Sequence, residues 1–307
     1  MIMNITAPIA DLRRLTIHDG PGTRDTVFVK GCPLHCLWCH NPESISAKPQ
    51  LLFRKNLCTG CGECAAVCPT AAHSLPNGIH IIDRAKCIVC GKCAEACLNG
   101  ALTLCGCKQN SPEETFRSLI KDKEFFLLSN GGVTISGGEP LLYPEFTLSL
   151  FKLLHGANIH TALDTCGAVP FSAFETVLPE TDMLLYDIKG MDAQRHRSNT
   201  GQDNSQILEN LSRLGKGQIP IEIRMPIVPG HNDSQEELIA AGQFFAPLPS
   251  IIRIRLLAYH SMARDKYAMC GRKDTMPDVE SPTQERLADM AVILARESGK
   301  PVSIPEH

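Results

Sequence analysis

Short apolar runs alternate along most of the chain with stretches in which apolar residues recur every three or four positions. The runs are typical of buried strands, and the stretches are typical of amphipathic helices. Strands are predicted over residues 25–30, 132–136, 158–163, 182–189, 219–228, 251–257 and 302–304, and helices over residues 111–128, 144–155, 171–178, 206–215, 234–246 and 283–298. Repeated strand–helix units predict a parallel sheet, and six or seven strands are too few to close an eight-stranded barrel. The predicted fold class is therefore α/β, a partial, open (β/α)6 TIM-like barrel.

Residues 51–108 interrupt this pattern with two similar runs of cysteines. The first is Cys58-x2-Cys61-x2-Cys64-x3-Cys68, and the second is Cys87-x2-Cys90-x2-Cys93-x3-Cys97, 29 residues further on. The repeat matches the bacterial two-cluster ferredoxin signature, in which the fourth cysteine of each run ligates the other cluster. We therefore expect an inserted ferredoxin-like α+β domain over 51–108, within a barrel formed by 1–50 and 109–307. Cys58, Cys61, Cys64 and Cys97 would hold one cluster, and Cys87, Cys90, Cys93 and Cys68 the other.

A zinc ribbon is the alternative interpretation of these cysteines. It would use pairs such as Cys61/Cys64 with Cys87/Cys90. Half of the cysteines in the two runs would then have no ligand role, so the ferredoxin pattern accounts for more of the sequence. Cys105 and Cys107 lie just outside the pattern, and no role is assigned to them.

The composition of the chain limits which partners the protein can bind and in which cellular compartment it is expected. The net charge is −3 with 21% charged residues, and no basic stripe occurs, so a nucleic-acid partner is not expected. No apolar run is long enough to span a membrane, and no secretory signal is visible, so we expect a cytoplasmic protein with no membrane association. Most of the fifteen cysteines stand in C-x2-C or C-x3-C steps, a spacing that suits metal ligation in a reducing, anaerobic compartment.

A third group of cysteines follows the first predicted strand. Cys32, Cys36 and Cys39 form a C-x3-C-x2-C triplet. Three thiolates on one loop can hold three irons of a [4Fe–4S] cluster, and the missing fourth cysteine leaves one iron open to an outside ligand. On spacing alone two alternatives remain, a zinc loop completed by His35 or His40 and three buried cysteines without a metal.

Polar residues and glycines stand at the ends of the later strands. Gly137, Gly138 and Glu139 follow the strand over 132–136, where glycines allow close backbone approach and a carboxylate can accept from an ammonium group. The residues at the following strand ends are Asp164, Thr165, Asp187, Lys189, Arg224 and His260. An ordinary Gly-Pro turn and structural salt bridges are the alternative explanations of these residues.

The N-terminal signature supports a specific resemblance. His18-Asp-Gly-Pro-Gly-Thr-Arg24 and Val27-Phe-Val-Lys-Gly-Cys-Pro-Leu-His-Cys-Leu-Trp-Cys-His-Asn-Pro-Glu-Ser44 closely resemble the N-terminus of radical S-adenosylmethionine (SAM) enzymes. Within that superfamily the run is similar to the glycyl-radical-enzyme activating enzymes, or activases. The resemblance covers nearly the whole chain and implies a barrel of the radical SAM type. Ala258, where the family usually has proline, and Asp25 depart from the family pattern.

The resemblance also implies roles for these residues. Cys32, Cys36 and Cys39 would hold the catalytic cluster, and Gly137, Gly138 and Glu139 match the motif that binds the amino group of SAM methionine. Asp164, Thr165 and Asp187 would lie near a monovalent cation, and Lys189, Arg224 and His260 would contact SAM or the active site. The implied cofactors are three [4Fe–4S] clusters, SAM and the cation.

The implied activity is that of an oxidoreductase similar to the formate-lyase activating enzyme. It would cleave SAM reductively to methionine and a 5′-deoxyadenosyl radical, which abstracts a hydrogen atom from a backbone glycine of a glycyl radical enzyme. The electron donor would be a reduced flavodoxin or ferredoxin, and we expect a monomer. The alternatives are a radical SAM enzyme acting on a small molecule and an iron–sulfur electron carrier.

Overall fold

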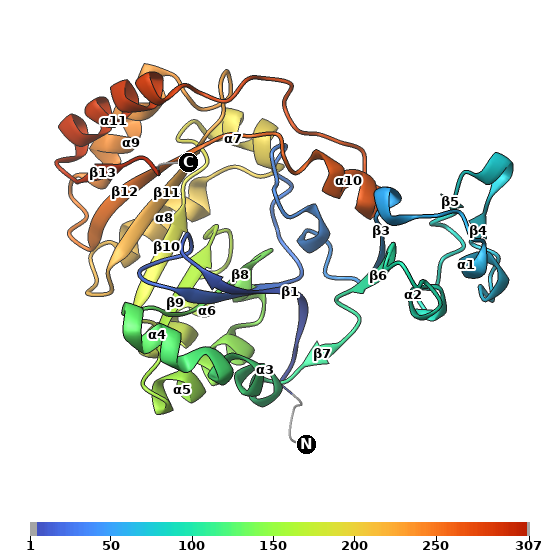
Figure 1. Cartoon of the computed structure of the whole chain (residues 1–307). Helices are drawn as coiled ribbons and strands as arrows, with labels where there is room; N and C mark the ends of the chain where they lie inside the picture. The colour runs from blue at the N-terminus through green and yellow to red at the C-terminus, as the bar shows by residue number, and fades with distance from the viewer. Residues whose placement is uncertain (1–4, 306–307) are drawn as a thin grey trace.

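The computed structural model describes residues 5–305, and a nine-stranded sheet forms its centre (Figure 1). The sheet order is β13-β12-β11-β10-β9-β8-β2-β1-β7, in which β1 is Ala7–Thr16 and β7 is Gln109–Asn110. The parallel strands are β2 (Arg24–Val29), β8 (Gly132–Gly137), β9 (His160–Thr165), β10 (Met183–Asp187), β11 (Ile221–Ile227), β12 (Ile251–Ala258) and β13 (Val302–Ser303). Strands β7 and β13 lie at opposite edges, so the barrel is open, as the strand count predicted.

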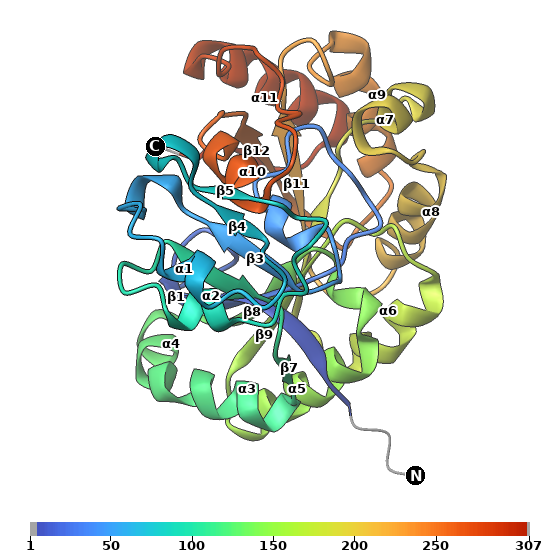
Figure 2. The same cartoon turned by 90° about the vertical axis from the view of Figure 1, so that its right-hand side faces the viewer.

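Helices cover the outside of this sheet, as Figure 2 shows. They are α3 (Pro112–Leu119), α4 (Lys123–Ser129), α5 (Pro144–Gly156), α6 (Phe171–Val177), α8 (Ser205–Leu214), α9 (Gln235–Phe245) and α11 (Gln284–Ser298). Ser111 and Glu114 form a capping box at the start of α3, which satisfies two backbone N–H groups that a helix start leaves unpaired. The helix predicted over 111–128 is two helices, because a 3-10 turn, Ile120–Asp122, separates α3 from α4. Within residues 5–305, no helix is both long and apolar enough to cross a membrane.

Four elements of the barrel were not predicted. Strand β1 (Ala7–Thr16) pairs antiparallel with β2, and β7 (Gln109–Asn110) pairs antiparallel with β1. Helix α7 (Ala193–Thr200) is almost entirely polar, and its asparagine, serine and threonine residues are weak helix formers. Helix α10 (Arg264–Cys270) has only seven residues, which is too short for a helical repeat of apolar positions to be recognised in the sequence.

The insert projects from the barrel as a smaller lobe (Figure 1). Its base is the antiparallel pair β3 (Gln50–Phe53) and β6 (Leu102–Cys105), and a second hairpin joins β4 (His73–Ser74) to β5 (Ile81–Ile82). It also holds the short helices α1 (Glu63–Ala66) and α2 (Lys92–Glu95). The domain boundaries 51–108 stay a prediction. The two paired strands at the base of the insert, β3 and β6, lie close to these boundaries.

The backbone of the insert follows the 29-residue sequence repeat. Gly62 precedes α1 with φ of 87°, and Gly91 precedes α2 with φ of 86°. Ala71 and Gly100, also 29 residues apart, have φ of 49° and 63°. Left-handed backbone at matching positions means that the two cysteine runs fold in the same way.

Helix α10 connects the insert to the barrel. Arg84 of the insert donates to the carbonyl of Met269 in α10 at 3.1 Å and also to that of Leu51 in β3. The same helix contacts the triplet loop, because Lys266 Nζ lies 2.8 Å from Glu43 Oε1 and the Tyr267 hydroxyl donates to Cys39 O at 3.1 Å. One short helix therefore touches both the triplet and the insert.

One histidine outside the site, His155, is paired with two carboxylates and predicts a pH-dependent contribution to stability. His155 Nδ1 lies 2.7 Å from Glu180 Oε2, and its Nε2 lies 3.0 Å from Asp182 Oδ2. Burial lowers the pKa of His155, but the hydrogen bonds to Asp182 and Glu180 outweigh it, so the pKa is raised. The stabilisation is therefore fully present below the unfolded pKa of about 6.5 and is lost as the pH rises through the raised pKa.

We expect His155→Gln to destabilise the fold by about 0.5–1 kcal/mol below pH ~6.5 and by less once the pH exceeds the raised folded-state pKa. Urea unfolding of both proteins at several pH values would measure the difference. Asp182→Asn, which removes one partner, should show the same trend. A difference that stays constant with pH would rule out the ion pairs as its source.

Candidate active site and cluster sites

The triplet loop follows β2 and is held by backbone hydrogen bonds. Cys32 N donates to Ile45 O at 3.0 Å, and Gly31 N donates to Ser44 O at 2.8 Å, so the loop closes on itself. Two further bonds, from His35 N to Thr200 O and from Leu37 N to Asn199 O, tie it to α7. The three cysteines are thereby placed at the carboxyl end of β2, where parallel α/β folds carry their chemistry.

The aromatic residue of the loop is part of a separate apolar cluster. Trp38 packs with Val228, Tyr259, Ala263, Tyr267 and Met276, all buried. Its ring lies 5.7 Å from that of His231, edge to face. This packing fixes the loop from the side of α10 and gives the single tryptophan a structural role.

The two glycines after β8 are required by backbone packing. An added Cβ on Gly138 would lie 2.0 Å from Gly31 O, and one on Gly137, which has φ of 119°, would lie 2.3 Å from Val29 N. Gly138 N also donates to Val29 O at 2.9 Å. The close approach that the sequence indicated is therefore made, in this structure, to the strand and loop that carry the triplet.

Glu139 is fully buried and accepts several hydrogen bonds. Thr165 Oγ1 donates to its carboxylate at 2.9 Å, Cys166 N at 2.9 Å and Leu141 N at 3.0 Å. The Cys166 thiol lies 3.0 Å from Oε2. Burial raises the pKa of Glu139, and these donors oppose the shift. The carboxylate therefore joins the ends of β8 and β9.

Charged groups of both signs alternate along the next strand ends. Arg224 Nη1 lies 3.4 Å from Asp164 Oδ1 and 3.5 Å from Asp19 Oδ1, and Lys189 Nζ lies 2.6 Å from Asp187 Oδ2. Ser136 Oγ donates to Asp164 Oδ2 at 2.6 Å. These residues come from strands β8 to β11, the segment after β10 and the loop between β1 and β2, so the sheet brings them together.

Burial and neighbouring charges together set the ionisation of this group. It raises the pKa of Asp164 to about 7, although Arg224 opposes the shift. Burial lowers the pKa of Lys189, but Asp187 and Cys36 outweigh it and leave the pKa above its ordinary value. A cation near Asp164 would favour its ionised form.

The triplet thiols differ in their ionisation. Burial raises the pKa of Cys36 to about 12 and that of Cys39 to about 11. A hydrogen bond with Cys166 lowers the pKa of Cys32. Metal ligation requires thiolates, so cluster assembly on this loop would release protons.

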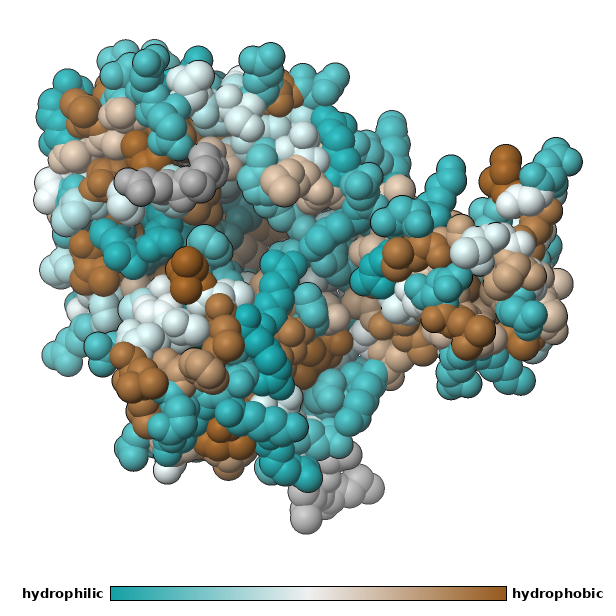
Figure 3. Space-filling model, in the orientation of Figure 1, coloured by the Kyte–Doolittle hydropathy of each residue, from teal (hydrophilic) through white to brown (hydrophobic). Residues whose placement is uncertain are grey.

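A cavity of about 780 Å³ brings the site together, and Figure 3 shows the barrel hollowed on the face turned to the viewer. Its volume is that of a pocket for a ligand of nucleotide size. Of the predicted barrel site residues, the following line it: Cys32, Cys36, Cys39, Gly137, Gly138, Asp164, Thr165, Asp187, Lys189, Arg224 and His260. Glu139 stands behind this wall rather than in it, within the part of the chain that the structure describes.

Among the other lining residues, to which the sequence had assigned no role, are Asp19, Ser136, Cys166 and Arg255. Asp19 belongs to the N-terminal signature, but nothing in the sequence indicated its contact with Arg224, which is 205 residues away. Arg255 lies on β12, paired with the buried Glu222 at 2.9 Å, and no local signal marks it.

The insert cysteines divide between two cavities. Cys58, Cys61, Cys64 and Cys97 line one, and Cys68, Cys87, Cys90 and Cys93 line the other. Each set holds three cysteines of one run and the fourth of the other run. Four thiols around one cavity fit the ligand set of a [4Fe–4S] cluster.

The barrel, the cysteine triplet and the paired cysteine sets define a radical SAM enzyme with additional iron–sulfur domains. The model of the radical SAM superfamily matches residues 104–241, that of the 4Fe-4S dicluster domain matches 50–98, and that of the 4Fe-4S single cluster domain matches 18–71. The fold agrees with a solved radical SAM methyltransferase from Sphaerobacter thermophilus, at a TM-score of 0.52 and 14% identity over 97% of this chain and 77% of that chain.

The chain belongs to the glycyl-radical-enzyme activating enzymes of the radical SAM superfamily. It is 37% identical to the (2S)-3-sulfopropanediol sulfolyase activating enzyme of Bilophila wadsworthia, over 90% of this chain and 92% of the relative. It is also 37% identical to the benzylsuccinate synthase activating enzyme of Thauera aromatica, over 93% of this chain and 89% of the relative. The resemblance predicted from the N-terminal signature is confirmed, and iron–sulfur clusters and SAM are the cofactors of this oxidoreductase class.

Proposed function

We propose that this protein cleaves SAM to methionine and a 5′-deoxyadenosyl radical, which abstracts a hydrogen atom from a backbone glycine of a glycyl radical enzyme. The observation that carries the proposal is the cavity in which the three triplet cysteines face the charged strand ends of the barrel. A cluster bound by three thiolates there would supply the electron and an open iron for methionine. The residues of the chain would have to bind SAM and orient it beside this cluster.

The cavity residues would bind and orient SAM. Lys189 and Arg224 offer positive charge to a carboxylate, and both side chains are mostly buried and held in ion pairs. Asp164, Thr165 and Asp187 would face a monovalent cation, while Gly137 and Gly138 hold β8 against the triplet loop. Glu139 would act on the methionine amine from behind this wall, through a short movement or through Thr165 and Cys166. His260 would border the same site.

The insert would hold the second and third [4Fe–4S] clusters. The cysteine sets around its two cavities support the crossed ligand assignment over the domain 51–108. A reduced flavodoxin or ferredoxin would be the donor, and one copy of the chain carries the complete set of predicted site residues, which supports a monomer.

The release of 5′-deoxyadenosine tests the proposal. Anaerobically reconstituted protein is given SAM and dithionite, first alone and then with a glycyl radical enzyme offered as its partner. We expect product in both cases, and a glycyl radical detected by electron paramagnetic resonance (EPR) only with the partner. Deuterium placed on the partner glycine should appear in 5′-deoxyadenosine. Product that carries hydrogen from a small molecule instead would favour the alternative class of radical SAM enzyme.

An insert cysteine gives a separate prediction. Cys61→Ala should remove one insert cluster, or about four irons, and leave the triplet cluster assembled, because the two sites lie on different lobes. Iron analysis with EPR would measure this. Cys107→Ala, which also changes an exposed cysteine, is the control and should keep all of the iron. An unchanged iron content in Cys61→Ala would contradict the ferredoxin-like assignment.

A further inference from the structure

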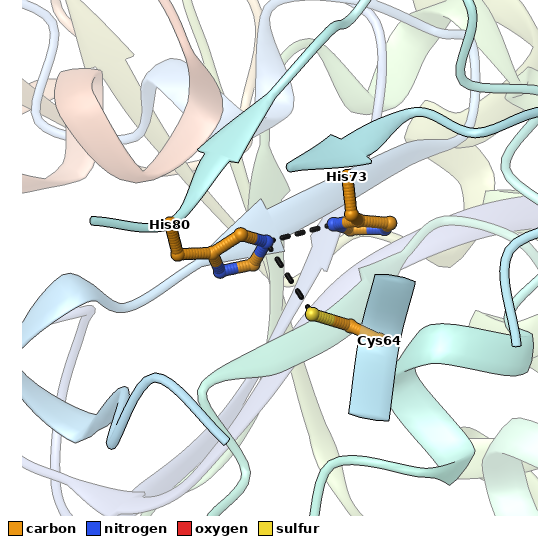
Figure 4. A group of neighbouring side chains, drawn as sticks. All are labelled: Cys64, His73 and His80. Carbon is orange, nitrogen blue, oxygen red and sulfur yellow. Dashed lines mark hydrogen bonds between the residues drawn. The ribbon is translucent and has the colours of Figure 1, made fainter. Parts of the chain in front are cut away.

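Two histidines of the insert form a hydrogen-bonded pair beside the cysteine sets (Figure 4). His73 Nδ1 lies 2.8 Å from His80 Nε2. The same imidazole of His80 approaches two thiols, with Nε2 at 3.5 Å from Cys64 Sγ and Nδ1 at 3.7 Å from Cys58 Sγ. Phe53 packs against the His80 ring edge to face at 4.6 Å, which holds its orientation.

The pair spans the space between the two cavities. His80 lines the cavity of Cys58, Cys61, Cys64 and Cys97, and His73 lines the cavity of Cys68, Cys87, Cys90 and Cys93. They are brought together by the hairpin of β4 and β5, since His73 begins β4 and His80 immediately precedes β5. One hydrogen bond therefore links the walls of both predicted cluster sites.

The sequence repeat does not supply a second pair. The positions 29 residues after His73 and His80 are Leu102 and Gln109. Leu102 is buried in the insert core, and Gln109 lies in β7 of the barrel sheet. Although the two cysteine runs fold alike, the imidazole thus approaches the thiols of only one predicted cluster in the described structure.

A metal ion held by Cys64, His73 and His80 is the competing explanation, because one ligand atom of each lies within 4.8 Å of the others. Such an ion would take Cys64 from the C-x2-C-x2-C run that the dicluster domain uses. A hydrogen-bond role uses the same geometry and leaves every cysteine of the run available. We therefore favour it.

We propose that His80, oriented by His73, donates a hydrogen bond to the Cys58 thiolate and thereby raises the reduction potential of the cluster held by Cys58, Cys61, Cys64 and Cys97 above that of the other insert cluster. This inference rests on the ligand sets of the proposed function.

The physical reason lies in the tautomer and in the charge of the reduced cluster. When His73 Nδ1–H donates to His80 Nε2, the proton of a neutral His80 stands on Nδ1, the atom that faces Cys58. Adding an electron makes the cluster sulfurs more negative, so a donor to them stabilises the reduced state and raises the potential. His80 is thus a positioning and tuning residue rather than a catalytic one.

Redox titration followed by EPR tests the proposal on the full chain. The titration uses a Cys36→Ala background, so that the insert clusters are observed without the triplet cluster, with dithionite as reductant. We expect His80→Leu to lower one of the two potentials by about 59 mV, the value of a tenfold change in a one-electron equilibrium. His80→Asn, which keeps a donor near the Nδ1 position, should restore part of the shift.

Leu75→Ala is the matched control, because Leu75 lines the same cavity without a polar side chain and its removal should leave both potentials unchanged. The proposal would be overturned if His80→Leu, at full iron content, had the same two reduction potentials as the protein with His80. It would also be overturned if the wild type bound one zinc ion per chain in place of cluster iron. Should His80→Leu lose its cluster, His73→Leu carries the test, and an unchanged potential there overturns it. A wild type without insert clusters would instead refute the proposed ligand sets.

Discussion

Cys36→Ala is expected to reduce 5′-deoxyadenosine release to the level of the protein without clusters. Cys36 is one of the three motif thiols that line the barrel cavity, and the triplet motif contains no fourth cysteine. A cubane held by two thiolates is not retained, so about four irons should be lost with the activity. The measurement is product release with SAM and dithionite, together with iron content.

Cys270→Ala is the matched control for this variant. Cys270 is a buried cysteine on α10 that lies outside every predicted ligand set. It should keep the full iron content and release product at a rate close to that of the wild type. Product release by Cys36→Ala at the wild-type rate would exclude the triplet as the ligand set of the reactive cluster.

Glu139→Ala should have the second largest effect, on stability and on SAM affinity together. The carboxylate accepts from Thr165, Cys166 and Leu141 in a fully buried position, and its removal leaves these donors without a partner. Unpaired buried donors cost about 1–3 kcal/mol each, so we expect the three to cost at least about 3 kcal/mol in total. The ends of β8 and β9 would shift, and the wall of the cavity with them.

Thermal unfolding and equilibrium binding of SAM measure the two effects separately. Glu139→Gln keeps the volume and one acceptor oxygen, so it should recover most of the stability while still binding SAM more weakly if the negative charge attracts the methionine amine. Full SAM affinity in Glu139→Gln would leave Glu139 with a purely structural role. Unchanged stability in Glu139→Ala would mean that the hydrogen bonds around the carboxylate contribute nothing measurable.

Much of the barrel was predictable because its elements are encoded locally. Strand β11 was predicted over 219–228 and is Ile221–Ile227, and helix α5 was predicted over 144–155 and is Pro144–Gly156. Buried parallel strands are continuous apolar runs, and amphipathic helices repeat every 3.6 residues, so each leaves a signal within about ten positions. Strand β1 was not predicted because four of its ten residues are exposed, which breaks up the apolar pattern, and its pairing with β2 is irregular.

The cysteine runs from which the cluster ligands are predicted were also visible in the sequence. Three of the ligands predicted for each insert cluster follow one another at steps of three residues, and the repeat of 29 residues marked the two cysteine runs as one unit. The strand-end residues of the barrel were predicted through their place in the pattern, since the carboxyl ends of parallel strands meet at one edge.

Only the tertiary structure decided which distant groups touch. Asp19 and Arg224 are 205 residues apart, and no local pattern indicates that they pair. The burial of Glu139 behind the cavity wall, the contact of α10 with both lobes, and the hydrogen bond between His73 and His80 likewise depend on how elements pack. Local periodicity and ligand spacing therefore determined the kind of protein, whereas long-range packing determined the environment of each reacting group, because burial and charge arise from neighbours that the chain brings together only on folding.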